Sequence, residues 1–148
     1  MITRVSDVMT EDVETVQSTE TLKEAAKKMR DCNIGALPVY MGSVLTGFVT
    51  DRDITVKATA KGVDPSVGKV EDVMTWKAEW CLGDADVKEA AHIMETKKVR
   101  RLAVLDRAGY LIGLLSVDDI ARRAHDSKSV EKVVEATAAH TASEGYEI

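Results

Sequence analysis

The chain has 148 residues, which is enough for one ordinary domain or for two small domains that share a core. Hydrophobic residues make up 45% and charged residues 30%, a balance typical of a folded globular protein that excludes a fibrous or disordered chain. The net charge of -5 gives no general attraction for phosphate polymers, so we expect no nucleic-acid partner.

No apolar run approaches the ~20 residues that a membrane-spanning helix needs, and no signal-peptide core follows Met1. We therefore expect a cytoplasmic protein with no membrane partner. The histidines His92, His125 and His140 lack metal-ligand spacing, so no metal site is expected.

In the first half of the chain, a helix, a strand pair and a second helix follow one another. Apolar residues recur with the spacing of one helix face from Leu22 to Met29, after a Thr-x-x-Glu capping box. Two apolar runs, Leu37 to Tyr40 and Leu45 to Val49, predict a hairpin. A second helix is predicted from about Asp51 to Ala60.

The second half repeats this order of elements. Apolar spacing predicts a helix from Val87 to Met94, with Asp86 as its N-cap. The runs Leu102 to Leu105 and Tyr110 to Leu115 predict a second hairpin, and a helix is predicted from about Val117 to Ala124.

The two halves are copies of each other. Residues 5–10 (VSDVMT) return as residues 70–75 (VEDVMT), 65 positions later, and 13 of 36 aligned positions are identical. After a one-residue insertion, residues 47–50 (GFVT) match residues 113–116 (GLLS). A duplication therefore organises the chain.

We assign residues 1–62 to the first repeat, 63–126 to the second, and 127–148 to a C-terminal helix and loose tail. A β-α-β-β-α unit of ~60 residues buries too little surface to be stable alone. We therefore expect an α+β fold in which two such repeats pack as a pseudo-two-fold pair, with a cleft where they face each other.

Three features connect the chain to a known family: the duplicated DVMT segment, residues 34–39 (IGALPV) and residues 47–53 (GFVTDRD). On these features the chain resembles the paired cystathionine β-synthase-type (CBS) domains, also called Bateman modules, over roughly residues 5 to 125. The resemblance implies tandem CBS repeats that bind an adenosine ligand between them and catalyse no reaction.

In that family a G-x-x-[ST]-x-x-D pattern holds the ligand, and both copies are intact here. The resemblance assigns Thr50 with Asp53 to one site and Ser116 with Asp119 to the other. A carboxylate accepts hydrogen bonds from ribose hydroxyls, and a helix N-terminus favours phosphate. The alternative interpretation is that [ST]-x-x-D is an ordinary helix cap.

The resemblance also places other segments around these motifs. Opposite Ser116 and Asp119 it places Met9, Thr10, Ile34, Gly35 and Ala36. Opposite Thr50 and Asp53 it places Met74, Thr75, Val99 and Arg100. Within the motifs, it adds the apolar residues Phe48 and Leu114.

A basic run makes the two predicted sites unequal. Lys97, Lys98, Arg100 and Arg101 precede the second hairpin, where the first repeat is uncharged. The two lysines fit a solvated turn. Arg101 stands where family members often present a phosphate-binding arginine, so it is the strongest phosphate candidate. We expect the site that contains Asp119 to be the stronger one.

We expect a regulatory module that requires no cofactor, binds AMP, ADP, ATP or S-adenosylmethionine, and signals by conformational change to an unknown effector protein. The resemblance implies a homodimer. The alternative is a constitutive dimeric scaffold with vestigial ligand clefts. An enzyme is not expected, because the sequence shows no nucleophile–base pair, metal constellation or Gly-rich phosphate loop.

Overall fold

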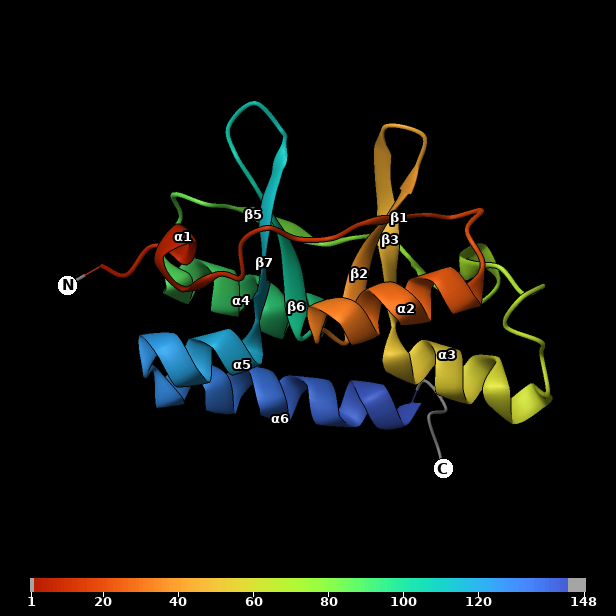
Figure 1. Ribbon diagram of the computed structural model, residues 1–148. Coiled ribbons are helices and arrows are strands. Elements are labelled where there is room, and N and C mark those ends of the chain that lie inside the picture. Colours follow the sequence, from red (N-terminus) through yellow and green to blue (C-terminus); the bar gives the residue numbers. More distant parts are fainter. Residues whose placement is uncertain (1, 144–148) are drawn as a thin grey trace. The chain divides into compact units, whose positions relative to one another are not determined.

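The computed structural model describes residues 2–143, and its contacts divide the chain into two compact units (Figure 1). Unit 1 combines Met1–Val13 with Glu79–Ile148, and unit 2 is Glu14–Ala78. These units differ from the repeats expected at 1–62 and 63–126. The reason is that the short segment near the start of each repeat pairs with the sheet of the other repeat.

Unit 2 contains a four-stranded sheet in the order β1-β2-β3-β4. Its elements are β1 (Val16–Gln17), α2 (Leu22–Cys32), β2 (Ala36–Met41), β3 (Val44–Thr50), α3 (Asp51–Lys57), two 3-10 turns (Thr59–Lys61 and Val70–Asp72) and β4 (Thr75–Trp76). The predicted hairpin is confirmed as β2 and β3, with β1 parallel to β2 and β4 antiparallel to β3.

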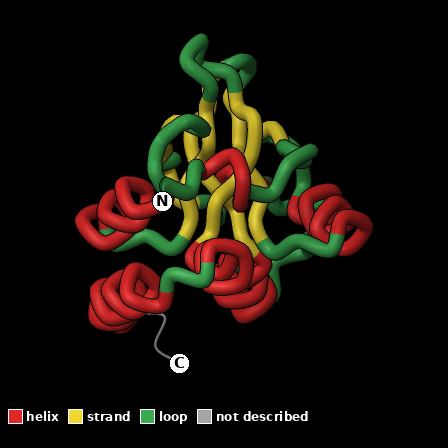
Figure 2. Tube along the Cα trace, turned by 90° about the vertical axis from the view of Figure 1, so that its left-hand side faces the viewer, coloured by secondary structure: helices red, strands yellow, loops and turns green. Residues whose placement is uncertain are grey.

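Unit 1 contains a three-stranded sheet in the order β5-β6-β7. Its elements are α1 (Val5–Val8), β5 (Trp80–Leu82), α4 (Val87–Lys97), β6 (Arg101–Leu105), β7 (Leu111–Ser116), α5 (Val117–Asp119), a π-helix (Ile120–Ala124) and α6 (Ser127–Ser143). In each unit, the hairpin turn and the helix that follows the hairpin lie at opposite ends of the strands (Figures 1 and 2). The predicted α+β fold with two β-α-β-β-α repeats is confirmed.

The helix starts follow the predicted capping, with two differences further along. At the start of α2, Glu24 N donates to Thr21 Oγ1 at 3.2 Å, which completes the capping box. At the start of α4, Asp86 accepts from Lys88 N. The helix predicted to reach Ala60 ends at Lys57 and continues as a 3-10 turn. The counterpart after β7 widens into a π-helix, which the sequence pattern did not predict.

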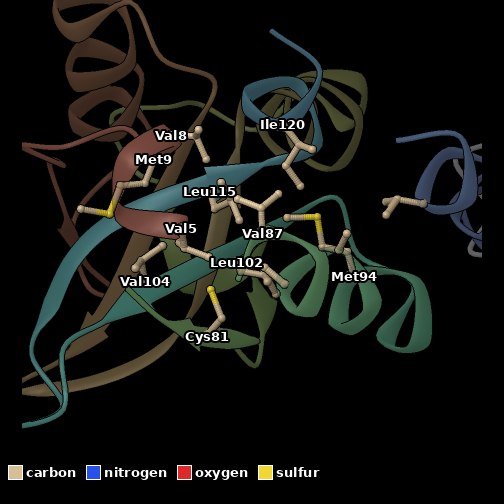
Figure 3. Packing of buried hydrophobic residues seen from close by; sticks show 13 residues of the cluster. Val5, Val8, Met9, Cys81, Val87, Met94, Leu102, Val104, Leu115 and Ile120 are labelled. Atoms are coloured by element: carbon tan, nitrogen blue, oxygen red, sulfur yellow. The ribbon is translucent and has the colours of Figure 1, made fainter. Parts of the chain in front are cut away.

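The core of unit 1 forms where α1, α4 and the three strands meet (Figure 3). Its largest fully buried side chains are Met94, Leu102, Leu115, Ile120, Val5 and Val87. The N-terminal segment thus contributes Val5, Val8 and Met9 to a core that is otherwise built from the second half of the chain. Unit 2 has its own core around Leu22, Leu37 and Val49.

The predicted C-terminal helix is confirmed as α6, which belongs to unit 1. Val133 is fully buried in the core and Thr137 is buried, while Val134 is 40% exposed. The helix continues through residues 141–143, where we expected a loose tail. Residues 144–148 lie outside the described range. Among residues 2–143, no helix combines the length and apolar character needed to cross a membrane.

We predict that the two thiols differ sharply in reactivity. Cys32 is exposed, whereas burial, with a smaller contribution from the negative charge of Glu89, raises the pKa of the Cys81 thiol to about 12. A thiol reagent such as DTNB at about pH 8 should therefore modify one cysteine in the native protein and two in urea. Cys32→Ser should remove the native reaction. Modification of two thiols without denaturant would contradict the buried position of Cys81.

Candidate ligand site

In unit 1, two residues of the motif bond to each other at the point where β7 ends and α5 begins. Asp119 N donates to Ser116 Oγ at 3.1 Å, and Ser116 N donates to Asp119 Oδ2 at 3.0 Å. The Asp119 side chain is held within this reciprocal pair, and the residue is only 4% exposed. The motif therefore acts as a capping box, as the alternative interpretation predicted.

The motif in unit 2 has the same construction between β3 and α3. Asp53 N donates to Thr50 Oγ1 at 3.0 Å, and Thr50 N donates to Asp53 Oδ2 at 2.9 Å. Asp53 is 2% exposed. In both units, capping fixes the carboxylate at the end of the strand and uses one of its two oxygens.

The two aspartates differ at the second oxygen. Asp53 Oδ1 forms an ion pair with Lys57 Nζ at 3.1 Å. Asp119 Oδ1 has no polar partner among the described residues. No enclosed side-chain oxygen or nitrogen in the described part of the chain lacks a partner, so Asp119 Oδ1 keeps a slight contact with solvent in a residue that is 4% exposed. This oxygen remains able to accept a hydrogen bond from a ligand hydroxyl.

The glycine of the motif allows an N-terminal segment to lie directly against β7. Thr10 N donates to Leu114 O at 2.8 Å, and Leu114 N donates to Thr10 O at 3.0 Å. A Cβ atom on Gly113 would stand 2.8 Å from Thr10 O and 2.5 Å from Met9 Sδ. Only glycine leaves room for this backbone pairing, which places Met9 and Thr10 beside the motif.

The same device is present in unit 2. Thr75 pairs with Phe48, and a Cβ atom on Gly47 would collide with Thr75 O and stand 2.8 Å from Met74 Cε. The segment that contains Met74 and Thr75 therefore approaches β3 as residues 9 and 10 approach β7.

The start of each hairpin completes the surroundings of the motif. In unit 1, Val117 N donates to Arg100 O at 2.9 Å, and Arg101 is paired with Ser116 across the sheet. The Arg100 side chain turns to α6, where Nε donates to Thr137 Oγ1 at 2.7 Å. The basic run therefore stands beside the capping box of unit 1.

In unit 2 the residues that correspond to Arg100 and Arg101 are the uncharged Gly35 and Ala36. Asp51 N donates to Gly35 O at 3.0 Å, and Ala36 is paired with Thr50. A Cβ atom on Gly35 would meet Asp51 Oδ2 at 3.1 Å, so the first turn of α3 lies close to this backbone.

The structure thus collects the predicted residues into two groups, one in each unit. Unit 1 holds Met9, Thr10, Val99, Arg100, Arg101, Leu114, Ser116 and Asp119. Unit 2 holds Ile34, Gly35, Ala36, Phe48, Thr50, Asp53, Met74 and Thr75. Residues 34–36 share a unit with Asp53, and Val99 and Arg100 share one with Asp119, while their expected position opposite the other motif stays a prediction.

The sequence reasoning missed two cations beside the motifs. Arg123 Nη1 donates to Val8 O at 3.2 Å and to Met9 O at 3.0 Å. Lys57 Nζ donates to Val73 O at 3.3 Å. The internal repeat could have revealed both residues, because each cation stands four residues after its motif aspartate and the two positions are equivalent.

Comparison with known proteins identifies the family. The model of the CBS domain matches twice, at residues 5–58 and 70–126, so the chain belongs to the CBS domain family. It is 36% identical over 117 residues to the CBS domain-containing protein YhcV of Bacillus subtilis, covering 79% of this chain and 82% of that protein.

Solved structures show the same fold. Hypoxic Response Protein I, crystallised with two coordinated zinc ions, has a TM-score of 0.69 at 35% identity, covering 82% of this chain and 98% of that one. The CBS domain pair of protein MJ0100, in complex with 5'-methylthioadenosine and S-adenosyl-L-methionine, has a TM-score of 0.72 at 27% identity, covering 86% and 99%. Within the described part of this chain, no three His, Cys, Asp or Glu side chains are grouped to hold a metal ion.

We predict that Gly113→Ala disrupts the pairing of residue 10 with β7, because the new methyl group meets the backbone oxygen of Thr10. The expected loss of stability is about 1–3 kcal/mol in urea unfolding, with faster hydrogen exchange at the amide of Leu114. Gly83→Ala is the matched control, since its nearest contact is the movable end of the Ile112 side chain. Equal effects of the two substitutions would contradict this role of Gly113.

Proposed function

We propose that the protein is a non-catalytic regulatory module that binds an adenine nucleotide or another adenosine ligand at the Ser116–Asp119 junction of unit 1. Asp119 would accept a hydrogen bond from a ribose hydroxyl, and Arg101 would bind the phosphate. The apolar residues Met9 and Leu114 would contact the adenine. Binding would favour one conformation of the module, and the signal would pass through a homodimer or a separate effector protein.

The observation that carries this proposal is the second oxygen of Asp119, which has no polar partner among the described residues. Capping fixes the carboxylate through Oδ2 and leaves Oδ1 in slight contact with solvent. A preoriented acceptor of this kind binds a hydroxyl without having to order a mobile side chain, which reduces the entropic cost of binding. The neighbouring cations of residues 100 and 101 supply the charge that a phosphate requires, in a protein whose net charge is -5.

The similarity to known proteins supports a ligand of the adenosine class. The CBS domain pair of MJ0100 is described with two such ligands. The two CBS matches account for most of the chain, which supports a binding role in preference to a catalytic one.

A scaffold with vestigial ligand sites is the second candidate. The observation that favours it is the low exposure of both motif aspartates, 2% and 4%, inside complete capping boxes. Calorimetric titration with AMP, ADP, ATP and S-adenosylmethionine distinguishes the two functions. The absence of binding at millimolar ligand would favour the scaffold.

We predict that Asp119→Ala weakens AMP binding at least tenfold, because the ribose loses a hydrogen bond to a charged acceptor. Isothermal titration calorimetry measures the effect. Asp118→Ala is the matched control: Asp118 stands on the same turn, is two-thirds exposed, and contacts Arg122 at 2.7 Å. Unchanged affinity in Asp119→Ala, combined with lost affinity in Asp53→Ala, would place the ligand in unit 2 instead.

We also predict that Arg101→Gln reduces the affinity for AMP about tenfold and leaves the affinity for adenosine unchanged, because only AMP presents a phosphate to the guanidinium. Lys97→Gln is the control for the general charge of the basic run, since Lys97 is exposed at the end of α4. A parallel loss of both ligands in Arg101→Gln would indicate a structural role for this arginine.

A further inference from the structure

A cation follows the aspartate of each motif at the same distance along the chain. Lys57 stands four residues after Asp53, and Arg123 stands four residues after Asp119. Each cation donates to a backbone carbonyl of the segment that lies against the motif glycine. The two side chains therefore share one structural task, which is to fix that segment beside the motif.

The two cations differ in what they do to the carboxylate. Lys57 Nζ also contacts Asp53 Oδ1 at 3.1 Å, while Thr50 N occupies Asp53 Oδ2. Both oxygens of Asp53 are thus engaged within unit 2. The Lys57 side chain is 36% exposed, whereas the Asp53 side chain is only 3% exposed. The ammonium group is therefore the charged partner of a carboxylate that has little contact with water.

Arg123 does not engage the second carboxylate oxygen of Asp119. Its guanidinium donates to the carbonyls of Val8 and Met9, and it has no contact with Asp119 among the interactions of the described residues. The planar fork of an arginine suits two adjacent acceptors, whereas the ammonium of a lysine acts as a compact point charge. In the unit with a lysine at this position, the second oxygen of the motif aspartate is paired. In the unit with an arginine, that oxygen has no polar partner among the described residues.

The backbone that follows the motif also differs between the two units. α3 is a regular helix over Asp51–Lys57, in which residues four apart lie on one face. After Asp119, the chain widens into the π-helix Ile120–Ala124, whose hydrogen bonds join residues five apart. Residues 57 and 123 therefore stand in different helical geometries, although both side chains donate to the carbonyl of an equivalent residue, Val73 in unit 2 and Val8 in unit 1.

From these contacts we infer that Lys57 is a built-in counter-ion that suppresses adenosine-ligand binding at the Thr50–Asp53 motif and thereby confines binding to the Ser116–Asp119 motif. The inference rests on the proposed function. A ribose hydroxyl at Asp53 must compete with an ammonium group already in place, whereas at Asp119 it meets an oxygen that has no polar partner within residues 2–143. Lys57 therefore determines whether the Thr50–Asp53 motif binds a ligand. A single substitution that removes its charge should allow binding at this second site.

The test is a calorimetric titration of the full chain with AMP. The wild-type protein should bind one equivalent at submillimolar AMP, with any second site at least tenfold weaker. Lys57→Met removes the charge and keeps an unbranched side chain of similar length, and it should bind two equivalents of AMP. Adding Asp53→Ala to Lys57→Met should return the stoichiometry to one. Lys61→Met, which removes an exposed lysine just after α3, is the matched control and should bind one equivalent.

The outcomes separate the inference from the proposed function. Two equivalents in the wild type, or one in Lys57→Met, would overturn the role of Lys57 and leave the function standing. No binding by either protein would overturn both. A thermal melt verifies that Lys57→Met is folded, and Lys57→Gln, which restores a polar donor to Val73, replaces it if it is not.

Discussion

The backbone pairing of the segment that opens each repeat against the second strand of a hairpin, β7 in unit 1 and β3 in unit 2, is the constraint on which the rest of the structure depends. Gly113 and Gly47 permit it, because any side chain at these positions would occupy the space of the neighbouring backbone. The pairing brings Met9 and Thr10 to the end of β7 and gives Arg123 two carbonyls to bind. The glycine of the family motif is thus explained by the contact between two chain segments, without reference to a ligand.

Capping and the proposed ligand binding make different demands on the same carboxylate, and the geometry of the motif allows both. One oxygen satisfies a backbone N–H at the start of the helix, so the side chain is held in a fixed orientation. The other oxygen is left to the local environment. In unit 1 that environment includes solvent, and in unit 2 it is an ammonium group. The second carboxylate oxygen is therefore paired in one copy of the motif and unpaired, among the described residues, in the other. The difference comes from Lys57, which lies outside the motif.

The sequence predicted the hairpins and most helices because apolar spacing and capping residues are local signals. Leu22 to Met29 and Leu102 to Leu105 lie where their patterns placed them. The composition of the compact units was not predictable in this way, since the pairing of Thr10 with Leu114 joins residues far apart in the sequence. The π-helix after Asp119 and the different roles of Lys57 and Arg123 also escaped prediction, because each depends on which carbonyl a side chain reaches in three dimensions.

The discontinuity of unit 1 has a consequence for how the chain is made. Unit 2 is one continuous stretch, Glu14–Ala78, and all its strands are available once that stretch has left the ribosome. The first 13 residues belong to unit 1, and their partner β7 is synthesised about 100 residues after Thr10. Until β7 has been synthesised, this segment cannot form its backbone pairing. The apolar side chains of Val5 and Val8 therefore lack their core partners during that time.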